Sequence, residues 1–357
     1  MKQKLSLIIT LIAPLFILNC SGKTTINTPK INPQTPVYNI PSTNSSPLLG
    51  RPIESISTPP PPLKPTKDIK KRPHLPPTPH KNISTGGTTS LLTKFKLPRS
   101  IKETSGLIKV DGKLWTINDS GGEAKLYQID EKNGRIIRTV SIKGAYNHDW
   151  EALTYDDHYV YIGDFGNNRG NRRDLKIYKI SRKALKNQKH IGAKTINFVF
   201  NDQKDFHSRP QKHNFDCEAM VAYHGKLYLF SKNWQDQKTR LYQLSNLVGT
   251  HKAYYKDSFN VQGLITDATV NRKLDILLLT SYSKLLSVNL WVFTNYPKEH
   301  FFKGESKKLT LNRLNAQVEG VTFIDNYKAY LSSEAFSKYI FSFDASLYQI
   351  DFSREFK

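Results

Sequence analysis

Acidic residues recur at the ends of short apolar strands in this 357-residue chain. In "WEALTYDDHYVYIGD" (150–164), Glu151 opens one predicted strand and Asp164 closes the next. Burying a carboxylate without a partner costs several kcal/mol, so such positions indicate either a site or a hydrated rim. The same arrangement along the chain gives the candidate metal ligands, which are Glu151, Asp164, Glu218, Asp267 and Glu319.

Two loops rich in glycine and asparagine, "NDSGGE" (118–123) and "DFGNNRGNRRD" (164–174), follow strands of the same kind. Carboxylate and amide oxygens suit hard cations, and we expect Ca²⁺ rather than zinc because no histidine-rich set is present. The alternative is that the acids pair with Lys232 and backbone N–H groups, or lie in water. The candidate ligand-binding residues are Asn118, Asp119, Asn167, Asn168, Arg169, Lys232 and Glu334.

Two residues are candidates for catalysis. His148, beside Asp149, is a candidate general base, and Glu151 is the carboxylate that would activate water beside a metal. A solitary histidine more often has no such role. Cys217 lies within an apolar strand, where a cysteine usually acts as a small core residue.

One strand pattern occurs five times between residues 91 and 357. Each copy has a first strand that begins with a small or acidic residue, a tight turn, a second strand, and a third strand that begins with Leu or Ile followed by an aromatic residue. The first strands are predicted at 105–110, 150–155, 217–222, 266–271 and 318–323. Four copies continue into a fourth strand, predicted at 137–142, 195–200, 253–259 and 306–311.

This repeat predicts an all-β fold, a β-propeller with five blades. A four-stranded meander cannot bury both of its faces alone, and stacking such units in a ring buries them. Six blades is the alternative if 202–215 hides an irregular unit, and a sandwich is the other fold. The segment "LLTKFKLP" (91–98) has no partner of its own, so we expect it to complete the last blade and close the ring.

The propeller arrangement brings the acidic strand ends together. The first residue of one strand in an antiparallel hairpin lies beside the last residue of the next strand. Because first strands line the channel of a propeller, we expect the acids to meet at one mouth of it. The positions that we take as equivalent are Gly106, Glu151, Glu218, Asp267 and Glu319.

The N-terminal segment predicts export and anchoring. "MKQKLSLIITLIAPLFILNC" (1–20) has two lysines, an apolar run and Cys20, which is the pattern of a secretory signal. "ILNC" resembles the lipobox of bacterial lipoproteins, so we expect a signal peptide at 1–19 and lipidation of Cys20. Since Ser21 follows the cysteine, we expect an outer-membrane location. Plain secretion or an uncleaved anchor is the alternative. Residues 20–90 read as a disordered Pro-rich linker, and residues 91–357 as the domain.

The net charge of +23 argues for anionic partners. Between Lys23 and Lys96 there are 11 Lys or Arg residues and two acids, so much of the excess lies in the linker. The rest is spread over a strand-rich region without a basic helix, zinc-finger spacing or RNA-binding signature. We therefore expect an anionic envelope polymer or a protein as partner, beside the membrane that holds the lipid anchor, and no nucleic acid.

The motifs "LWTINDSGGEAKLYQID" (114–130), "NHDWEALTYDDHYVYIGDFGNNRGNRRDLKIYKI" (147–180) and "VEGVTF" (318–323) resemble the secreted bacterial β-propellers grouped with esterase-like phytase and SdiA-regulated-type domains. The resemblance covers roughly residues 97–357 and implies an extracytoplasmic propeller that can carry metal in its channel. It implies no particular reaction, because these families combine hydrolases with proteins of no assigned activity. The "RHGxR" motif of histidine phosphatases is absent from the sequence.

Two functions of different classes follow. The first is a membrane-tethered binding protein that holds a ligand or envelope partner on its channel face. The second is a Ca²⁺-dependent hydrolase of phosphate esters, esters or lactones that uses the carboxylates of the mouth. The sequence favours the first narrowly and leaves open whether the protein is an enzyme.

Overall fold

The computed structural model describes residues 83–89, 91–283, 287–311, 317–338 and 341–356. The predicted signal peptide, Cys20 and most of the predicted linker lie outside these residues. The described part is all-β, as the repeat predicts, and its longest helix is α2 (Arg182–Asn187). No helix in the described ranges is long and apolar enough to cross a membrane.

The strands follow the predicted order in five consecutive units. Each unit begins with an antiparallel meander in which neighbours along the chain pair. Unit 1 contains β3 (Thr104–Val110), β4 (Lys113–Asn118), β5 (Lys125–Ile129) and β6 (Ile136–Lys143). Unit 2 contains β7 (Trp150–Tyr155), β8 (Tyr159–Asp164), β9 (Lys176–Ser181) and β11 (Lys194–Phe200). Unit 3 contains β12 (Asp216–Tyr223), β13 (Lys226–Lys232), β14 (Thr239–Ser245) and β15 (Gly249–Phe259). Unit 4 contains β16 (Leu264–Asn271), β17 (Ile276–Tyr282), β18 (Val288–Thr294) and β19 (Glu305–Leu311).

Unit 5 takes its outer strand from the other end of the domain. It consists of β20 (Val318–Phe323), β21 (Lys328–Ser333), β24 (Ser346–Asp351) and β2 (Leu92–Lys96). β2 pairs antiparallel with β24, as predicted for the segment 91–98. A small hairpin, β22 (Phe336–Lys338) and β23 (Phe341–Phe343), is inserted before β24.

Three pairings differ from the prediction of separate four-stranded units. Units 2 and 3 share one eight-stranded sheet, because their outer strands β11 and β15 pair in parallel. β10 (His190–Gly192) extends the sheet of unit 1. β1 (Ile83–Thr89), within the range predicted as linker, pairs in parallel with β19. Each added strand pairs backbone groups that an edge strand would otherwise expose, and backbone pairing needs no apolar sequence pattern.

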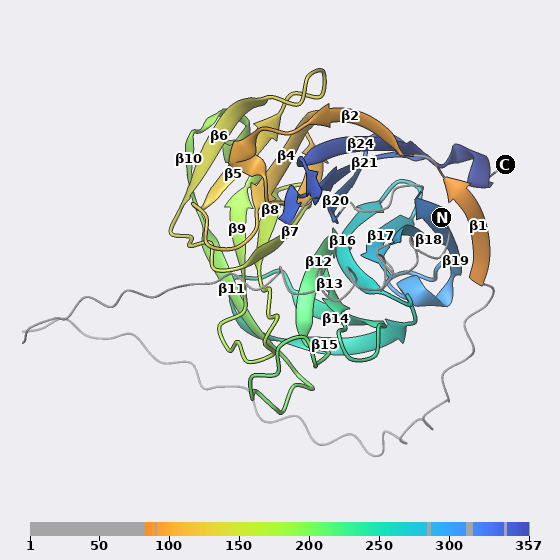
Figure 1. The fold of residues 1–357 in the computed structure, drawn as a ribbon. Helices are drawn as coiled ribbons and strands as arrows, with labels where there is room; N and C mark the ends of the chain where they lie inside the picture. Colours follow the sequence, from red (N-terminus) through yellow and green to blue (C-terminus); the bar gives the residue numbers. More distant parts are fainter. Residues whose placement is uncertain (1–82, 90, 284–286, 312–316, 339–340, 357) are drawn as a thin grey trace, which may run out of the picture. The chain divides into compact units, whose positions relative to one another are not determined.

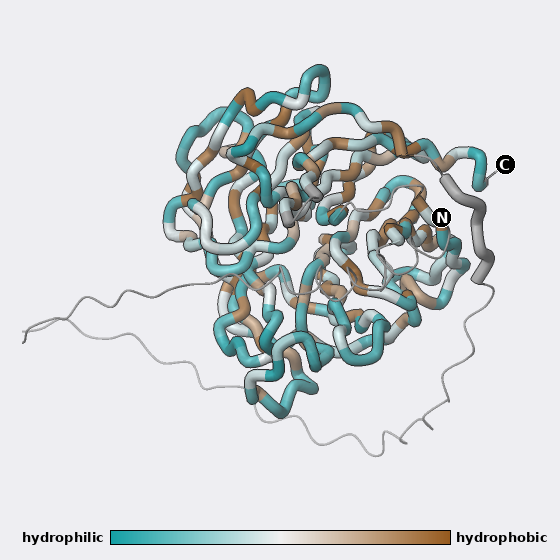
Figure 2. The backbone as a smooth tube through the Cα atoms, in the orientation of Figure 1, coloured by the Kyte–Doolittle hydropathy of each residue, from teal (hydrophilic) through white to brown (hydrophobic). Residues whose placement is uncertain are grey.

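The apolar cores lie between consecutive units. One cluster packs unit 1 on unit 2 around Trp115 and Trp150, and the next packs unit 2 on unit 3 around Phe198 and Tyr242. Three further clusters join units 3 and 4, units 4 and 5, and units 5 and 1. Along the tube of Figure 2 the apolar stretches fall on the strands and the loops are mostly hydrophilic. Both faces of most strands are therefore buried, which explains their nearly continuous apolar sequences.

The first strands also contact one another in a closed cycle. β3 contacts β7, β7 contacts β12, β12 contacts β16, β16 contacts β20, and β20 contacts β3. Figure 1 shows β7, β12, β16 and β20 close together where the sheets converge. This cycle brings the starts of all five units together.

Gly106 lies where two of these first strands approach each other most closely. Its φ is +61°, and a Cβ there would lie 2.7 Å from the backbone nitrogen of Leu153. The left-handed conformation disfavours any other residue, and the neighbouring strand leaves no space for a side chain.

We expect Gly106→Ala to lower the free energy of unfolding by about 2–5 kcal/mol, because a conformational penalty of about 1–2 kcal/mol adds to overpacking of about 1–3 kcal/mol. The matched control is Gly112→Ala, since Gly112 has φ +69° but open space around it. Urea denaturation of both variants separates the two causes. Equal losses in the two variants would show that the close approach of the strands has no energetic weight.

Candidate functional site

A one-residue bulge interrupts the first strand of every unit. The pairing register shifts between Ser105 and Leu107, and at the corresponding place in the other four units. The bulged residues are Gly106, Glu151, Glu218, Thr266 and Glu319. A bulge turns a side chain out of the regular alternation of the strand, and bulges are frequent beside functional sites. Three of the five bulges therefore direct a glutamate toward the same edge of the sheets.

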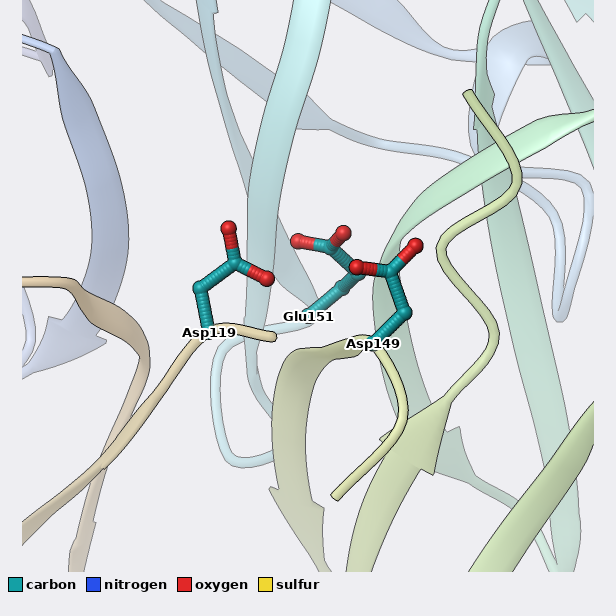
Figure 3. A group of neighbouring side chains, drawn as sticks. All are labelled: Asp119, Asp149 and Glu151. Carbon is teal, nitrogen blue, oxygen red and sulfur yellow. The ribbon is translucent and has the colours of Figure 1, made fainter. Parts of the chain in front are cut away.

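Three carboxylates come together at this edge, which we call the mouth. Asp119 follows β4, Asp149 precedes β7, and Glu151 is the bulged residue of β7. One oxygen from each lies within 4.8 Å of the others, and Figure 3 shows the three carboxylates turned toward one another. Glu151 is buried, whereas Asp119 and Asp149 are partly exposed. Among the described residues, this is the one group of three acidic, histidine or cysteine side chains close enough to share a metal ion.

Gly166 makes room for this group. A Cβ at Gly166 would clash with Oε1 of Glu151 and with Oδ2 of Asp149. The backbone nitrogens of Phe165 and Gly166 both donate to the carbonyl oxygen of Asp149 at 3.2 Å. The loop that begins "DFGNN" thus holds the backbone of Asp149 in place, and its glycine leaves space for the carboxylate.

Hydrogen bonds fix the loops around the three carboxylates. The Asn147 side chain donates to the carbonyl oxygens of Asn118 and Asp119, at 3.0 and 2.8 Å. The buried Asn167 donates from its backbone nitrogen to Asp216 Oδ1 at 2.6 Å and from its side chain to the Phe215 carbonyl at 2.9 Å. Asn167, a predicted ligand-binding residue, therefore joins two loops of the protein.

Lys232 supplies positive charge within the mouth. Its side chain is 2% exposed, and Nζ lies 3.2 Å from Oε2 of Glu218. The other oxygen of Glu218, Oε1, is buried and has no hydrogen-bond partner in the described structure. The sequence offers pairing of the acids with Lys232 as the alternative to a metal, and one acid, Glu218, does pair with it.

Burial raises the pKa of the acids of the mouth. The pKa of Asp119 is raised to about 6 and that of Glu319 to about 7, chiefly because the surrounding protein removes water, and the charge of Lys232 opposes both shifts. Burial, with repulsion from neighbouring carboxylates, also raises the pKa of Asp149 and Glu151. The pKa of Glu334 is also raised, mainly by burial and secondly by the charge of Glu319. A cation would relieve the repulsion among these groups.

Two predicted ligands have other partners. The fully buried Asp164 forms an ion pair with Arg172 at 2.9 Å, and one of its oxygens has no hydrogen-bond partner among the described residues. The fully buried Asp267 accepts hydrogen bonds from the backbone nitrogens of Ala268 at 2.8 Å and Val321 at 2.7 Å, so it joins β16 to β20. The predicted equivalence of Asp267 with Glu151 is wrong, because the bulge of β16 falls on Thr266.

The remaining candidates lie around the mouth. His148 is 52% exposed and its Nδ1 lies 3.5 Å from Asp174. Asn118 donates to the Ser100 carbonyl at 2.8 Å, and its own side-chain oxygen is buried without a partner in the described part. The side-chain oxygen of Asn168 is likewise unpartnered there, and Arg169 is exposed.

Sequence reasoning missed Asp149 as a member of the cluster, and also Asp216 and Trp234. From the sequence, Asp149 is named only as the neighbour of the candidate base His148. A signal for two of them was present, because Asp-x-Glu occurs at 149–151 and again at 216–218. The recurrence of this pattern at the start of two first strands could have marked both aspartates as candidates.

We expect stability without metal to fall as the pH rises from about 5 to about 8. Glu319 has a pKa of about 7 in the folded state against an ordinary value of 4.5, so between these values the folded state holds a proton that the unfolded state releases. Glu319→Gln should remove on the order of 3 kcal/mol of this decline. Denaturation in EDTA over this pH range measures it, with Glu123→Gln as the control because that side chain is 73% exposed. A decline of the same size in Glu319→Gln would contradict the assignment.

No protein-family model and no curated protein sequence matches this chain. The resemblance to esterase-like phytase and SdiA-regulated-type propellers therefore depends on the sequence motifs alone.

Proposed function

We propose that the domain is a five-bladed β-propeller that binds a ligand or envelope partner at its mouth, with Ca²⁺ held there. Three features support the propeller: the five units, the apolar clusters between consecutive units, and the cycle of contacts among first strands. Pairing of β2 with β24 joins the two ends of the domain, as closure of a propeller requires.

The group of Asp119, Asp149 and Glu151 is the observation that carries the proposal of a cation. Their oxygens lie within 4.8 Å of one another. Ligands of Ca²⁺ lie about 2.3–2.6 Å from the ion, so oxygens on opposite sides of it are up to about 5 Å apart. Three carboxylates at this spacing repel one another, and a divalent cation among them replaces repulsion with attraction.

Ca²⁺ takes six to eight oxygen ligands, more than three monodentate carboxylates supply. The remaining positions would take water or oxygens of a bound ligand. Because Asp119 and Asp149 are partly exposed, the ion would be accessible from solvent on that side. A carboxylate, phosphate or hydroxyl of the ligand could then complete the coordination.

The predicted signal peptide and lipidated Cys20 would place this mouth outside the cytoplasm, tethered to the outer membrane. Dissolved Ca²⁺ is available there, and anionic envelope polymers are potential ligands. In this proposal the basic linker connects the domain with the membrane and the mouth performs the recognition.

Isothermal titration of the metal-free protein with CaCl₂ tests the site. We expect one high-affinity ion and, in Glu151→Gln, at least tenfold weaker binding, which is about 1.4 kcal/mol. The control is Glu123→Gln, whose exposed side chain lies in the loop of Asp119 but outside the group. Heats of binding that are identical in wild type and Glu151→Gln would refute the site.

A Ca²⁺-dependent hydrolase is the second candidate, and one observation favours it. His148 is exposed, is paired with Asp174, and directly precedes Asp149. A histidine oriented by a carboxylate beside a metal-bound substrate could act as a general base.

If this second candidate is correct, we expect Ca²⁺-dependent hydrolysis of 4-nitrophenyl phosphate or 4-nitrophenyl acetate. His148→Ala should lower the rate by about 10²–10⁴-fold, and His224→Ala should leave it unchanged. His224 is a matched control because it forms a similar pair with Glu299, at 3.4 Å, in the turn after β12. Absence of turnover in protein that binds Ca²⁺ would contradict the hydrolase and leave ligand binding as the proposed function.

A further inference from the structure

A small cavity opens beside the mouth where units 3 and 4 meet. It has a volume of about 210 Å³. Its walls come from the loop before β12, the loop after β13 and the start of β16. The lining residues are Pro210, Gln211, Lys212, Trp234, Gln237, Gly263 and Leu264.

Trp234 is held rigidly in the wall of this cavity. Its indole N–H donates to Oδ2 of Asp216 at 2.7 Å, and its backbone nitrogen donates to the His213 carbonyl at 3.1 Å. Lys232 Nζ lies 5.2 Å from the ring centre. The same Asp216 accepts from the backbone nitrogen of Asn167, which directly follows Gly166 at the carboxylates of Asp149 and Glu151. The tryptophan is therefore connected through one carboxylate to the acids of the mouth.

The exposure of Trp234 sets it apart from the other tryptophans. The chain has four, and Trp115, Trp150 and Trp291 are each at most 1% exposed. Trp234 is partly exposed. An oriented aromatic ring that is partly exposed offers apolar surface to a ligand at little entropic cost.

The loops around the ring are fixed as well. Gln211 and Gln237 both have φ of +55°, a left-handed conformation that costs a residue other than glycine about 1–2 kcal/mol. Backbone hydrogen bonds hold both loops: Gln211 N donates to the Asn168 carbonyl at 2.9 Å, and Gly263 N donates to the Gln237 carbonyl at 3.2 Å. The cavity is thus largely formed before any ligand arrives.

We infer that this cavity is a subsite for one sugar ring of an acidic oligosaccharide. A pyranose has an apolar face of C–H groups, which packs on an indole ring, and hydroxyl edges, which require polar neighbours such as amides. The volume is below the roughly 300–1,000 Å³ of sites for drug-sized ligands, so it suits a single ring. Lys212 is exposed at the cavity and favours an anionic substituent.

This inference rests on the proposed ligand-binding function of the mouth and specifies its ligand class. A neighbouring acidic group of the same oligosaccharide would be attracted to the cation proposed at Asp119, Asp149 and Glu151. Recognition would then combine a ring on Trp234 with a charged group at the ion. Neutral oligosaccharides would have only the first of these contacts.

The test is titration of the full protein with trigalacturonate in Ca²⁺, followed by tryptophan fluorescence and by calorimetry, with maltotriose as the neutral probe. We expect a saturable fluorescence change, because Trp234 is the partly exposed tryptophan. Trp234→Ala should weaken trigalacturonate binding at least tenfold in calorimetry, and Trp234→Phe should weaken it less. Lys212→Gln should weaken trigalacturonate several-fold and leave maltotriose unaffected.

Two results would overturn the inference: no saturable signal with trigalacturonate in protein that still binds Ca²⁺, or binding that Trp234→Ala and Lys212→Gln leave unchanged. Either would leave the cation proposal intact. Loss of Ca²⁺ binding is measured separately, in Glu151→Gln, so the two failures are distinguishable. Should Trp234→Ala fail to fold, as circular dichroism would show, Trp234→Phe and Lys212→Gln decide the question.

Discussion

Repulsion among buried carboxylates is the constraint on which the arrangement of this domain depends. Acids from units 1, 2, 3 and 5 meet at one mouth, and Lys232 is the buried cation among them. Burial and repulsion from neighbouring carboxylates raise the pKa of these acids. Without further positive charge, the packing of the domain must offset this unfavourable arrangement of charges. Among the described residues, Oε1 of Glu218 has no hydrogen-bond partner.

The apolar clusters between units hold the acids in place. Each cluster joins two consecutive units, and the cycle of first strands lets every unit support the next. The bulges add direction, because a strand without one would place its glutamate in the regular alternation of the sheet. Glycine is needed where this geometry leaves no space, at Gly106 between two strands and at Gly166 against the carboxylates.

The mouth and the cavity beside it combine three kinds of chemistry. The centre of the mouth is acidic. The exposed Arg169, in the loop after β8, and the exposed Lys212, in the loop before β12, add positive charge around it, and Trp234 adds an oriented aromatic surface. Asp216 connects these parts, since it fixes Asn167 on one side and Trp234 on the other. A ligand with hydroxyl and acidic groups matches this combination better than a purely apolar or purely cationic one.

The sequence by itself determined the strand order and the five-unit repeat, because these follow from local patterns. The strand supplied by 91–98 and the meeting of Glu151 with Asp119 follow from stacking the repeated units in a ring. Only the tertiary structure decided the joining of units 2 and 3, the pairing of Asp267 with backbone nitrogens, the ion pair of Asp164, and the place of Asp149 and Trp234. The physical reason is that pairing of edge strands and partners of a buried carboxylate depend on groups far apart in the chain. A one-residue bulge moreover changes which side chain faces the mouth, and no local sequence pattern marked that it falls on Thr266 rather than on Asp267.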